Sequence, residues 1–298
     1  MSSTLYKPRS LGGDIKMVSF KPYLDYHVHE HHSGDARDAY IEAYARRAEE
    51  LGLSEIAFTT HLIVKGPDEE VGIDPGSITD YLEEIEEAQD GTDVKLLSGL
   101  EVDYFPEEER LLEEILDEHC FDLILGATHF IHGCDIGSRE QNEFFFRDRP
   151  PSEAIDEYYS VWRRGVESQL FDVMAHPDYF RKYVHLFRKP LTWREFGSEV
   201  NEAIYALADY NVGIEVNTSG YRHGMGDSFP LIEFLERARS VGVGKVTIGS
   251  DSHITGNLGY RLDQAVDKLV RAGYGTLSVF RSRSNKNVPI REFTDYDG

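Results

Sequence analysis

Short apolar runs alternate with longer amphipathic stretches along nearly the whole chain. Each apolar run has the length and composition of a buried strand, and each stretch that follows it carries apolar residues at helical spacing. Strands joined by helices run parallel, because the helix carries the chain back before the next strand begins. The alternation therefore predicts an α/β fold with seven parallel strands in one closed or nearly closed barrel, over residues 23–28, 55–60, 94–102, 121–127, 171–175, 212–216 and 245–248.

The segments between these strands carry the signals of helix ends. Gly52 is expected to end the first helix, Ser77 to cap the second and Pro106 to open the third. The sequence Thr-Trp-Arg-Glu at residues 192–195 has the form of a capping box ahead of a helix that ends near Tyr210. The other predicted elements are helices over 36–51, 152–169, 229–241 and 258–271 and a short closing strand over 277–280.

The length of 298 residues suits either two average domains or one large barrel. No linker composition or internal repeat divides the chain, so we expect a single domain over residues 1–298 with a polar lead-in over residues 1–19. Residues 132–151 are polar, irregular and long for a loop of a compact domain. We predict that this insert forms a lid over the active site and sets the choice of substrate.

Charge and cysteine content narrow the class of protein. The formal net charge of -23 would repel polyanions, which argues against nucleic acid or a membrane surface as a partner. Cys120 and Cys134 are the only cysteines, so a disulfide framework is not expected. No run of about 18 apolar residues is present to span a bilayer, and the lead-in lacks the apolar core of a signal peptide. We expect a cytoplasmic protein.

Histidines and carboxylates gather at the C-terminal ends of the predicted strands. His27 and His29 lie two residues apart on one strand, so their imidazoles point to the same side. The C-terminal ends of all barrel strands meet at one mouth, where the active sites of such barrels lie. A hydrogen-bonded structural role could explain any one of these histidines, but not their recurrence at His27, His29, His61, His129, His176 and His253, together with Glu101 and Asp251.

This set of donors predicts a metal site. Imidazole and carboxylate ligands without thiolates suit zinc, manganese or iron, and the pattern does not choose among these metals. The strand ends offer more ligands than one ion needs. We therefore expect a multinuclear centre.

The metal-ligand pattern resembles that of the polymerase and histidinol phosphatase (PHP) superfamily, and the resemblance covers almost the whole chain. Within that superfamily, residues 214–220 with Arg222, and residues 249–253, are similar to the monofunctional histidinol-phosphate phosphatases. The resemblance implies a distorted (β/α)7 TIM-like barrel with up to three divalent metal ions at the C-terminal ends of its strands. It rests on His27-Val28-His29, His61, Glu101, His129, His176 and Asp251-Ser252-His253.

The resemblance also implies a ligand set of nine residues: His27, His29, Glu101 and Asp251 for the first ion, Glu101, His129 and His176 for the second, and Asp35, His61 and His253 for the third. Asp35 stands where the superfamily carries histidine or aspartate, and His32 in the same loop is the alternative ligand. Asp25 is expected to orient an imidazole through its free ring nitrogen. We expect His31, His119 and His185 at the surface.

Such a centre supports the hydrolysis of phosphate monoesters. A hydroxide that bridges two metal ions is a nucleophile at neutral pH, because coordination lowers the pKa of water towards about 7. Glu101 would serve this centre as the bridging carboxylate, and His32 or His223 could protonate the departing alcohol. The candidates for contacts to the phosphate are Arg222, then Arg181, and more weakly Ser228, although either arginine could instead pair with a surface acid.

The leading hypothesis is a phosphatase that hydrolyses histidinol phosphate to histidinol and phosphate in histidine biosynthesis. The alternative within the superfamily is a phosphoesterase for another small monoester, such as a nucleotide or a sugar phosphate. An amidohydrolase-like barrel lacks support, because Arg222 is present and the lysine that such sites often carboxylate is not. A non-catalytic barrel would be expected to have lost ligand positions. The partner predicted is a small phosphorylated substrate, and a homo-oligomer is compatible with the sequence.

Overall fold

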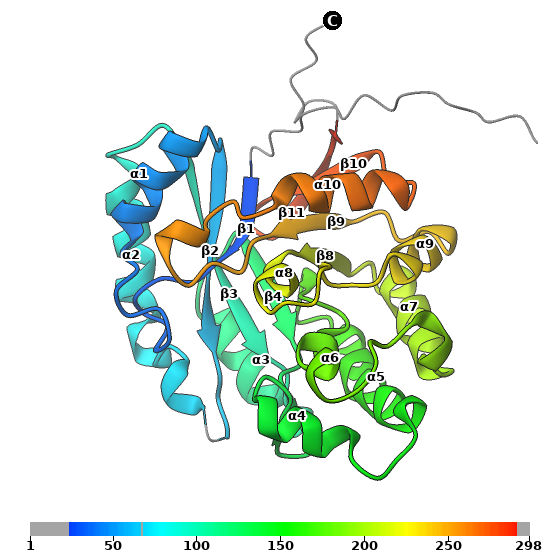
Figure 1. Ribbon diagram of the computed structural model, residues 1–298. Coiled ribbons are helices and arrows are strands. Elements are labelled where there is room, and N and C mark those ends of the chain that lie inside the picture. Colours follow the sequence, from blue (N-terminus) through cyan, green and yellow to red (C-terminus); the bar gives the residue numbers. More distant parts are fainter. Residues whose placement is uncertain (1–23, 67, 291–298) are drawn as a thin grey trace, which may run out of the picture.

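The protein is built around a curved sheet of seven parallel strands, shown in Figure 1 for a computed structural model that describes residues 24–66 and 68–290. Neighbours in the sheet follow one another along the chain, and every pairing is parallel. The predicted strands are confirmed as β1 (Leu24–Val28), β2 (Glu55–Leu62), β3 (Lys95–Asp103), β4 (Leu123–Ala127), β7 (Val173–Met174), β8 (Gly213–Asn217) and β9 (Val246–Gly249). The predicted lead-in of residues 1–19 lies outside the described residues.

The sheet closes almost completely on itself. Val28 and Ser252 form a parallel bridge between the two edges, with the His29 N–H donating to the Ser252 carbonyl at 2.8 Å and the Ser252 N–H to the His27 carbonyl at 3.2 Å. No continuous ladder joins β1 to β9 in the part of the chain that the structure describes. The result is the predicted distorted barrel, whose seam lies beside the residues that follow β1 and β9.

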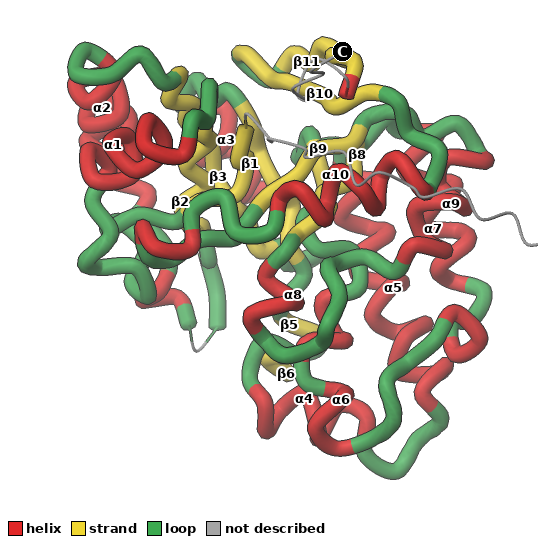
Figure 2. Tube along the Cα trace, turned by 45° about the horizontal axis from the view of Figure 1, so that its top comes forward, coloured by secondary structure: helices red, strands yellow, loops and turns green. Residues whose placement is uncertain are grey.

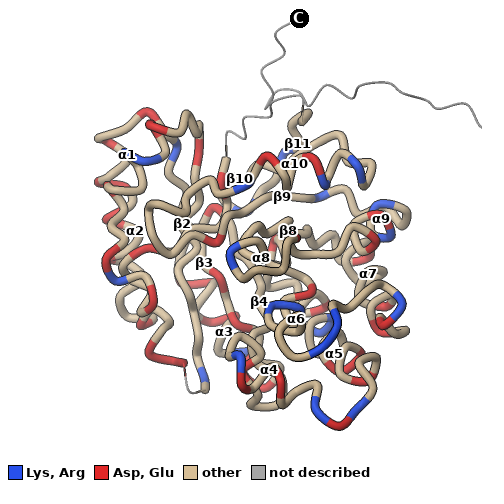
Figure 3. The backbone as a smooth tube through the Cα atoms, viewed as in Figure 1, with Lys and Arg blue, Asp and Glu red and all other residues tan. Residues whose placement is uncertain are grey.

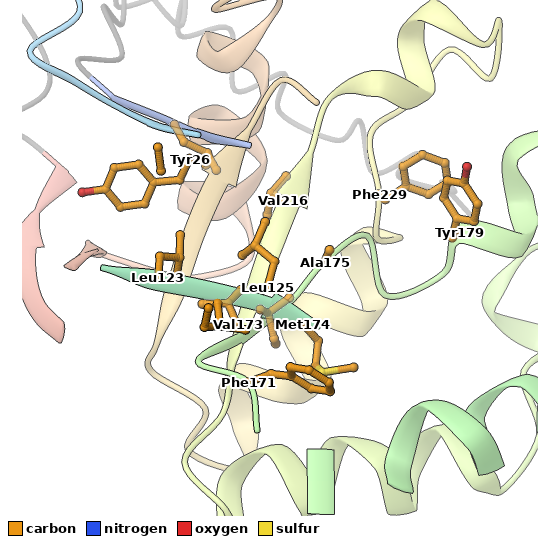
Figure 4. Packing of buried hydrophobic residues seen from close by; sticks show 14 of the residues in the cluster. Tyr26, Leu123, Leu125, Phe171, Val173, Met174, Ala175, Tyr179, Val216 and Phe229 are labelled. Atoms are coloured by element: carbon orange, nitrogen blue, oxygen red, sulfur yellow. The ribbon is translucent and has the colours of Figure 1, made fainter. Parts of the chain in front are cut away.

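Apolar side chains fill the inside of the barrel up to the polar residues at its mouth. Leu123, Leu125 and Val173 are fully buried in this core (Figure 4). Each such side chain contributes about 1.5–3 kcal/mol on burial, so the floor beneath the mouth is well fixed. The core ends at Tyr179, whose ring centroid lies 4.5 Å from that of His176.

Helices cover the outside of the barrel (Figures 1 and 2). Within residues 24–66 and 68–290, none of them is both long and apolar enough to cross a membrane. The longer helices are α1 (Ile41–Leu51), α2 (Ile78–Gln89), α3 (Glu109–Asp117), α4 (Arg139–Phe146), α5 (Pro151–Ser168), α7 (Glu199–Asp209), α9 (Ile232–Ser240) and α10 (Leu262–Arg271), and the single turns are α6 (Val184–Phe187) and α8 (Ser219–Arg222).

Five helices begin three or more residues later than predicted: α1, α3, α7, α9 and α10. Helix α1 starts at Ile41 rather than at residue 36, because hydrogen-bonded turns occupy the chain before it. The capping box at Thr192 is present, but it caps a single 3₁₀ turn over Trp193–Glu195. The backbone is extended at Phe196, with φ -77° and ψ 127°, so α7 begins only at Glu199. The predicted end of α1 is confirmed, since Gly52 has the left-handed φ of 72°.

The insert over residues 132–151 has regular structure rather than the irregular conformation that the sequence suggested. Phe145 and Phe146 are buried on its inner side. Asp135 and Gly137 line the cavity at the mouth of the barrel, so this segment contributes to the wall of that cavity. Its elements are α4 and a short antiparallel hairpin of β5 (Phe130–Ile131) and β6 (Cys134–Asp135).

The predicted closing strand does not join the barrel. It forms an antiparallel hairpin, β10 (Thr276–Arg281) with β11 (Ser284–Pro289), which Figure 2 shows apart from the barrel strands. Arg281 pairs with Glu55 at the start of β2, and Arg283 Nε lies 3.1 Å from an oxygen of Asp172, just before β7. These ion pairs hold the hairpin at the N-terminal ends of the strands, opposite the mouth.

Candidate metal centre

His27 and His29 end the first strand and point into the barrel, as their spacing predicts. Their Nε2 atoms lie 3.0 Å apart, and both are fully buried. Glu101 Oε2, at the end of β3, lies 3.2 Å from His27 Nε2 and 3.4 Å from His29 Nε2. Asp251 Oδ1, after β9, lies 3.5 Å from His29 Nε2 and 3.9 Å from His27 Nε2. The structure thus brings together the four residues predicted for the first ion.

The second predicted group shares Glu101. Glu101 Oε1 lies 2.6 Å from His176 Nε2 and 3.7 Å from His129 Nε2. Its two oxygens therefore face different groups of imidazoles, as a bridging carboxylate requires. His176 occupies a left-handed conformation with φ 25°, which turns its side chain towards the barrel axis directly after the short strand β7.

The third predicted group lies on the other side of His29. Asp35 Oδ2 is 3.0 Å from His253 Nε2 and 3.6 Å from His61 Nε2. The rings of His61 and His253 stack on that of His29, each with a centroid distance of 4.1 Å. Asp35, and not the alternative His32, therefore completes this group, and all nine predicted ligands lie in one cluster.

Carboxylates behind the cluster orient its imidazoles. Glu215 Oε1 lies 2.7 Å from His27 Nδ1, and Glu215 Oε2 accepts the His176 backbone N–H at 3.0 Å. Asp103 Oδ2 lies 3.1 Å from His129 Nδ1. Contacts of this kind fix the ring orientation and raise the basicity of a ligating imidazole.

The predicted role of Asp25 as an imidazole partner is wrong. Its carboxylate accepts the backbone N–H groups of Ser250 at 2.8 Å and Gly259 at 2.9 Å, and of His27 at 3.4 Å. Asp25 thus ties the end of β1 to the segment after β9. Glu215, on β8, takes the orienting role instead, because its side chain reaches His27 across the interior of the barrel.

The charges of the cluster shift the pKa values of its ligands in opposite directions: despite burial, nearby carboxylates raise those of His27, His61 and His129, whereas those of Glu101 and His29 are lowered. Burial favours the protonated form of Glu101, but the imidazoles of His27, His129 and His176 hold its pKa well below its usual range. Burial, followed by the positive charges of His253 and His61, lowers the pKa of His29 to about 4. At neutral pH the carboxylate is therefore anionic and His29 is neutral.

The spacing of the donor atoms fits a divalent cation. Four donors around zinc, with bonds of about 2.0–2.1 Å, stand about 3.3 Å from one another in a tetrahedron. The contacts among His27, His29, Glu101 and Asp251 run from 3.0 to 3.9 Å. Imidazole nitrogens and carboxylate oxygens converge here without a thiolate, a set that suits zinc, iron or manganese.

The cluster forms the floor of a cavity of about 470 Å³ at the mouth of the barrel. Lys182, Arg222 and His223 line its wall, and so do the carboxylates of Asp68, Asp103 and Asp135. The cavity therefore offers cationic and anionic groups above a metal-binding floor. The remaining lining residues are Ile63, Val71, Phe130, Gly137, Tyr179 and Asn257, together with the ligands Asp35, His61, Glu101, His129, His176, Asp251 and His253.

Among the predicted substrate contacts, Arg222 lines this cavity. Its guanidinium donates to the carbonyls of Ser250 at 2.6 Å and of Asp251 at 2.5 Å, which fixes it beside the segment that carries a metal ligand. His223 also lines the cavity, where burial and then the charge of Lys182 lower its pKa to about 4. A neutral imidazole has no proton to spare for an alkoxide at pH 7, so the structure does not favour His223 as the acid.

Three other predicted contacts lie outside the cavity lining. Arg181 is buried, and its guanidinium lies 2.8 Å from Asp178 and 3.1 Å from Asp227. The hydroxyl of Ser228 accepts a hydrogen bond from Lys268 at 3.0 Å. This placement does not support the two predicted phosphate contacts, because both side chains belong to a buried network with Asp178, Asp227 and Lys268.

His32 is the third. It faces away from the cavity, and its Nδ1 lies 2.9 Å from the buried carboxylate of Glu30. This placement does not support the predicted role of His32 in protonating the alcohol.

Sequence reasoning missed Lys182. Its ammonium donates to the Tyr179 hydroxyl at 2.7 Å, and burial lowers its pKa. Sequence reasoning also missed two acidic residues of the cavity wall, Asp68 and Asp135. Asp135 lies in the insert that was singled out by its length, which was the one available signal.

The fold and this site define a class: a parallel barrel that carries, at its mouth, a cluster of histidines and carboxylates that could hold metal ions. A model of the PHP domain matches residues 25–219, which make up more than half of the chain. The protein belongs to the PHP family.

Curated relatives and a solved structure agree with this assignment. The chain is 27% identical over 266 residues to a probable histidinol-phosphatase of Deinococcus radiodurans, which covers 87% of this chain and 96% of the relative. It is 25% identical over 260 residues to the histidinol-phosphatase of Lactococcus lactis, with 86% and 94% covered. The crystal structure of the Lactococcus lactis histidinol phosphate phosphatase, complexed with zinc, L-histidinol and phosphate, aligns with a TM-score of 0.75 at 23% identity over 90% of this chain and 100% of that chain.

Proposed function

We propose that this protein is a metal-dependent phosphatase that hydrolyses histidinol phosphate to histidinol and phosphate, a step of histidine biosynthesis. The observation that carries the proposal is the ligand cluster at the floor of a cavity whose wall carries both cationic and acidic side chains. The names of the relatives point the same way. We further propose up to three divalent ions, zinc, manganese or iron, on the nine ligands described above.

Hydrolysis of a monoester breaks the bond between phosphorus and the alcohol oxygen, adds one water oxygen to phosphorus and returns a proton to the alkoxide. Bound metal ions would supply an activated water and neutralise charge on the phosphoryl oxygens. Lys182 and Arg222 would hold the outer phosphoryl oxygens, because both carry a positive charge at the cavity wall. Glu215 and Asp103 would keep His27 and His129 in the tautomer that presents Nε2 to the centre.

The acidic residues of the cavity wall, Asp68, Asp103 and Asp135, explain a preference for a substrate with an amino group. Burial, and then the charges of Asp135 and Asp103, raise the pKa of Asp68, as expected for carboxylates that share one region. A cationic ammonium group placed there would relieve this repulsion. Histidinol phosphate carries both an ammonium and a phosphate, and the cavity wall offers acidic and cationic side chains to bind them.

The substrate assignment is tested by phosphate release from histidinol phosphate and from a panel of nucleotide, sugar and glycerol phosphates, with the protein loaded separately with zinc, manganese or iron. We expect histidinol phosphate to have the highest kcat/KM. In Asp135→Asn this advantage over glycerol phosphate should fall by about tenfold, as one charged contact contributes roughly 1.5–3 kcal/mol. Nucleotide turnover equal to or faster than that of histidinol phosphate would overturn the assignment in favour of another small monoester.

Replacing Lys182 with methionine should raise the KM for histidinol phosphate. The variant keeps the length of the side chain but removes one charged contact to phosphate, so kcat/KM should fall by about 10- to 100-fold. Lys245→Met, whose ammonium donates to the Asn211 carbonyl far from the mouth, is the matched control and should keep normal kinetics. An unchanged KM in the Lys182 variant would remove this residue from the phosphate site.

A further inference from the structure

We propose that a separate metal-binding site lies behind the turn that follows β1, where Glu30, His31 and His32 bind one zinc-type divalent cation. These three residues point away from the cavity at the mouth, and none of them lines it. They take no part in the proposed hydrolysis. The site is therefore an addition to the cluster described above.

Three consecutive residues present donor atoms to one point. Glu30 Oε2 lies 3.1 Å from His31 Nδ1 and 2.9 Å from His32 Nδ1, and one donor atom of each residue lies within 4.8 Å of the other two. These spacings are close to the separation of about 3.3 Å between the ligands of a tetrahedral zinc ion. Only a small outward movement of the rings is needed to admit the ion.

A second carboxylate completes the arrangement. Glu84, on α2, places Oε2 3.2 Å from His31 Nε2 and 3.7 Å from His32 Nε2. Each imidazole thus has a carboxylate at both of its nitrogens. A ligating histidine typically donates its other N–H to a carboxylate, and Glu84 lies within reach of that role for His31 and 3.7 Å from His32. Two neutral imidazoles, two carboxylates and one divalent cation also sum to zero charge, which favours occupancy in a partly buried place.

The site is rigid on its inner side and open on its outer side. Glu30 is fully buried, accepts the His32 backbone N–H at 2.9 Å and also accepts a hydrogen bond from the Thr60 hydroxyl. The side chains of His31 and His32 are 24% and 17% exposed.

Glu84 also lines a groove of about 460 Å³ between α1 and α2, on the outer side of the proposed site. Figure 3 shows many acidic residues on these two helices. Glu42, Glu49 and Glu87 line this groove too. Their charges raise the local concentration of cations. An ion can therefore reach the site without passing through the mouth of the barrel.

The position of the site suggests what it stabilises. The turn it would hold lies between His29 and Asp35, which end up in the metal centre at the mouth. A cation on Glu30, His31 and His32 would tie this turn to α2 through Glu84. The predicted effect is structural, on the stability of the turn.

The test is the zinc content of the full-length protein, equilibrated with buffered free zinc and measured by elemental analysis. The double variant His31→Asn/His32→Asn should bind one equivalent less than the wild type at the same free zinc. The matched control is His119→Asn/His132→Asn, which removes two histidines far from the turn, one of them 71% exposed, and should bind the wild-type amount. Equal zinc contents in the wild type and the His31/His32 variant would overturn the proposal, as would an equal loss in the control.

A second variant keeps the proposal testable if the double variant does not fold. Glu84→Gln changes a partly exposed side chain and should leave the maximum zinc content unchanged. One equivalent should then require about 10- to 100-fold more free zinc for half saturation, because the acceptor for the His31 ring N–H is weakened. Identical zinc titrations of Glu84→Gln and the wild type would also overturn the proposal.

Discussion

Replacing Glu101 with glutamine should lower the turnover of histidinol phosphate by about a thousandfold or more and reduce the metal content of the protein. Its carboxylate lies within 3.7 Å of the five imidazoles of His27, His29, His61, His129 and His176. Glutamine has the same shape but no charge, and its N–H₂ would face ring nitrogens. The loss of this charge should raise the activation free energy by several kcal/mol. Since about 1.36 kcal/mol corresponds to a tenfold change in rate, an effect of this size follows.

The measurement for Glu101→Gln combines phosphate release with elemental analysis of the dialysed protein. Glu113→Gln, on the exposed side of α3, makes the same chemical change elsewhere and should behave as the wild type. A circular dichroism spectrum and a melting curve establish that the variant is folded. Normal turnover with normal metal content in Glu101→Gln would contradict the assignment of this residue as the bridge.

The second large effect is on stability. Asp25→Asn should lower the free energy of unfolding by about 2 kcal/mol or more, because an amide cannot accept all the backbone N–H groups that the buried carboxylate accepts. The carboxylate receives hydrogen bonds from Ser250 and Gly259 at 2.8 and 2.9 Å, and its N–H₂ replacement would face at least one of these donors. Burial also raises the pKa of Asp25, which shows how little water reaches it.

Urea unfolding in the presence of a chelator measures this loss without the contribution of bound metal. Asp74→Asn serves as the control. Its exposed carboxylate accepts the Gly76 N–H at 2.9 Å, a single hydrogen bond that an asparagine oxygen can also accept, so its unfolding midpoint should be unchanged. Equal midpoints for Asp25→Asn and the wild type would show that the tie between β1 and the segment after β9 contributes little.

The metal ligands could be predicted from the sequence because the geometry of a parallel barrel places them. A residue at the C-terminal end of a strand lies at the mouth whatever the loops do, so His61, Glu101, His129 and Asp251 needed only correct strand assignments. Asp35 lies in a loop, and its prediction came from the family resemblance. The structure supports that choice over His32 by placing Asp35 beside His253.

The substrate contacts were harder to predict, because they lie on turns beyond the strand ends. Residues Tyr179–Lys182 form a 3₁₀ turn, in which successive side chains point about 120° apart. Arg181 therefore enters a buried ion pair, while its neighbour Lys182 reaches the cavity. No periodic pattern in the sequence distinguishes the two directions.

The position of the predicted closing strand could not be predicted for a similar reason. Ser282 and Arg283 both have positive φ, 47° and 61°, as a two-residue turn of type I′ requires. Neither residue is the glycine or asparagine that usually signals such a turn. The hairpin therefore has no local signature, and its attachment to Glu55 and Asp172 depends on contacts between distant parts of the chain.

The incomplete seam of the barrel bears on how the protein acquires activity during synthesis. Among the described residues, a single backbone bridge, between Val28 and Ser252, joins the first and last edges, and it lies beside ligands contributed by both ends of the chain. A growing chain that stops before β9 still lacks Asp251 and His253, and with them part of the first and third groups of ligands. The metal centre can therefore be completed only after nearly the whole barrel has been made, so partly synthesised chains should be unable to hold the full set of ions.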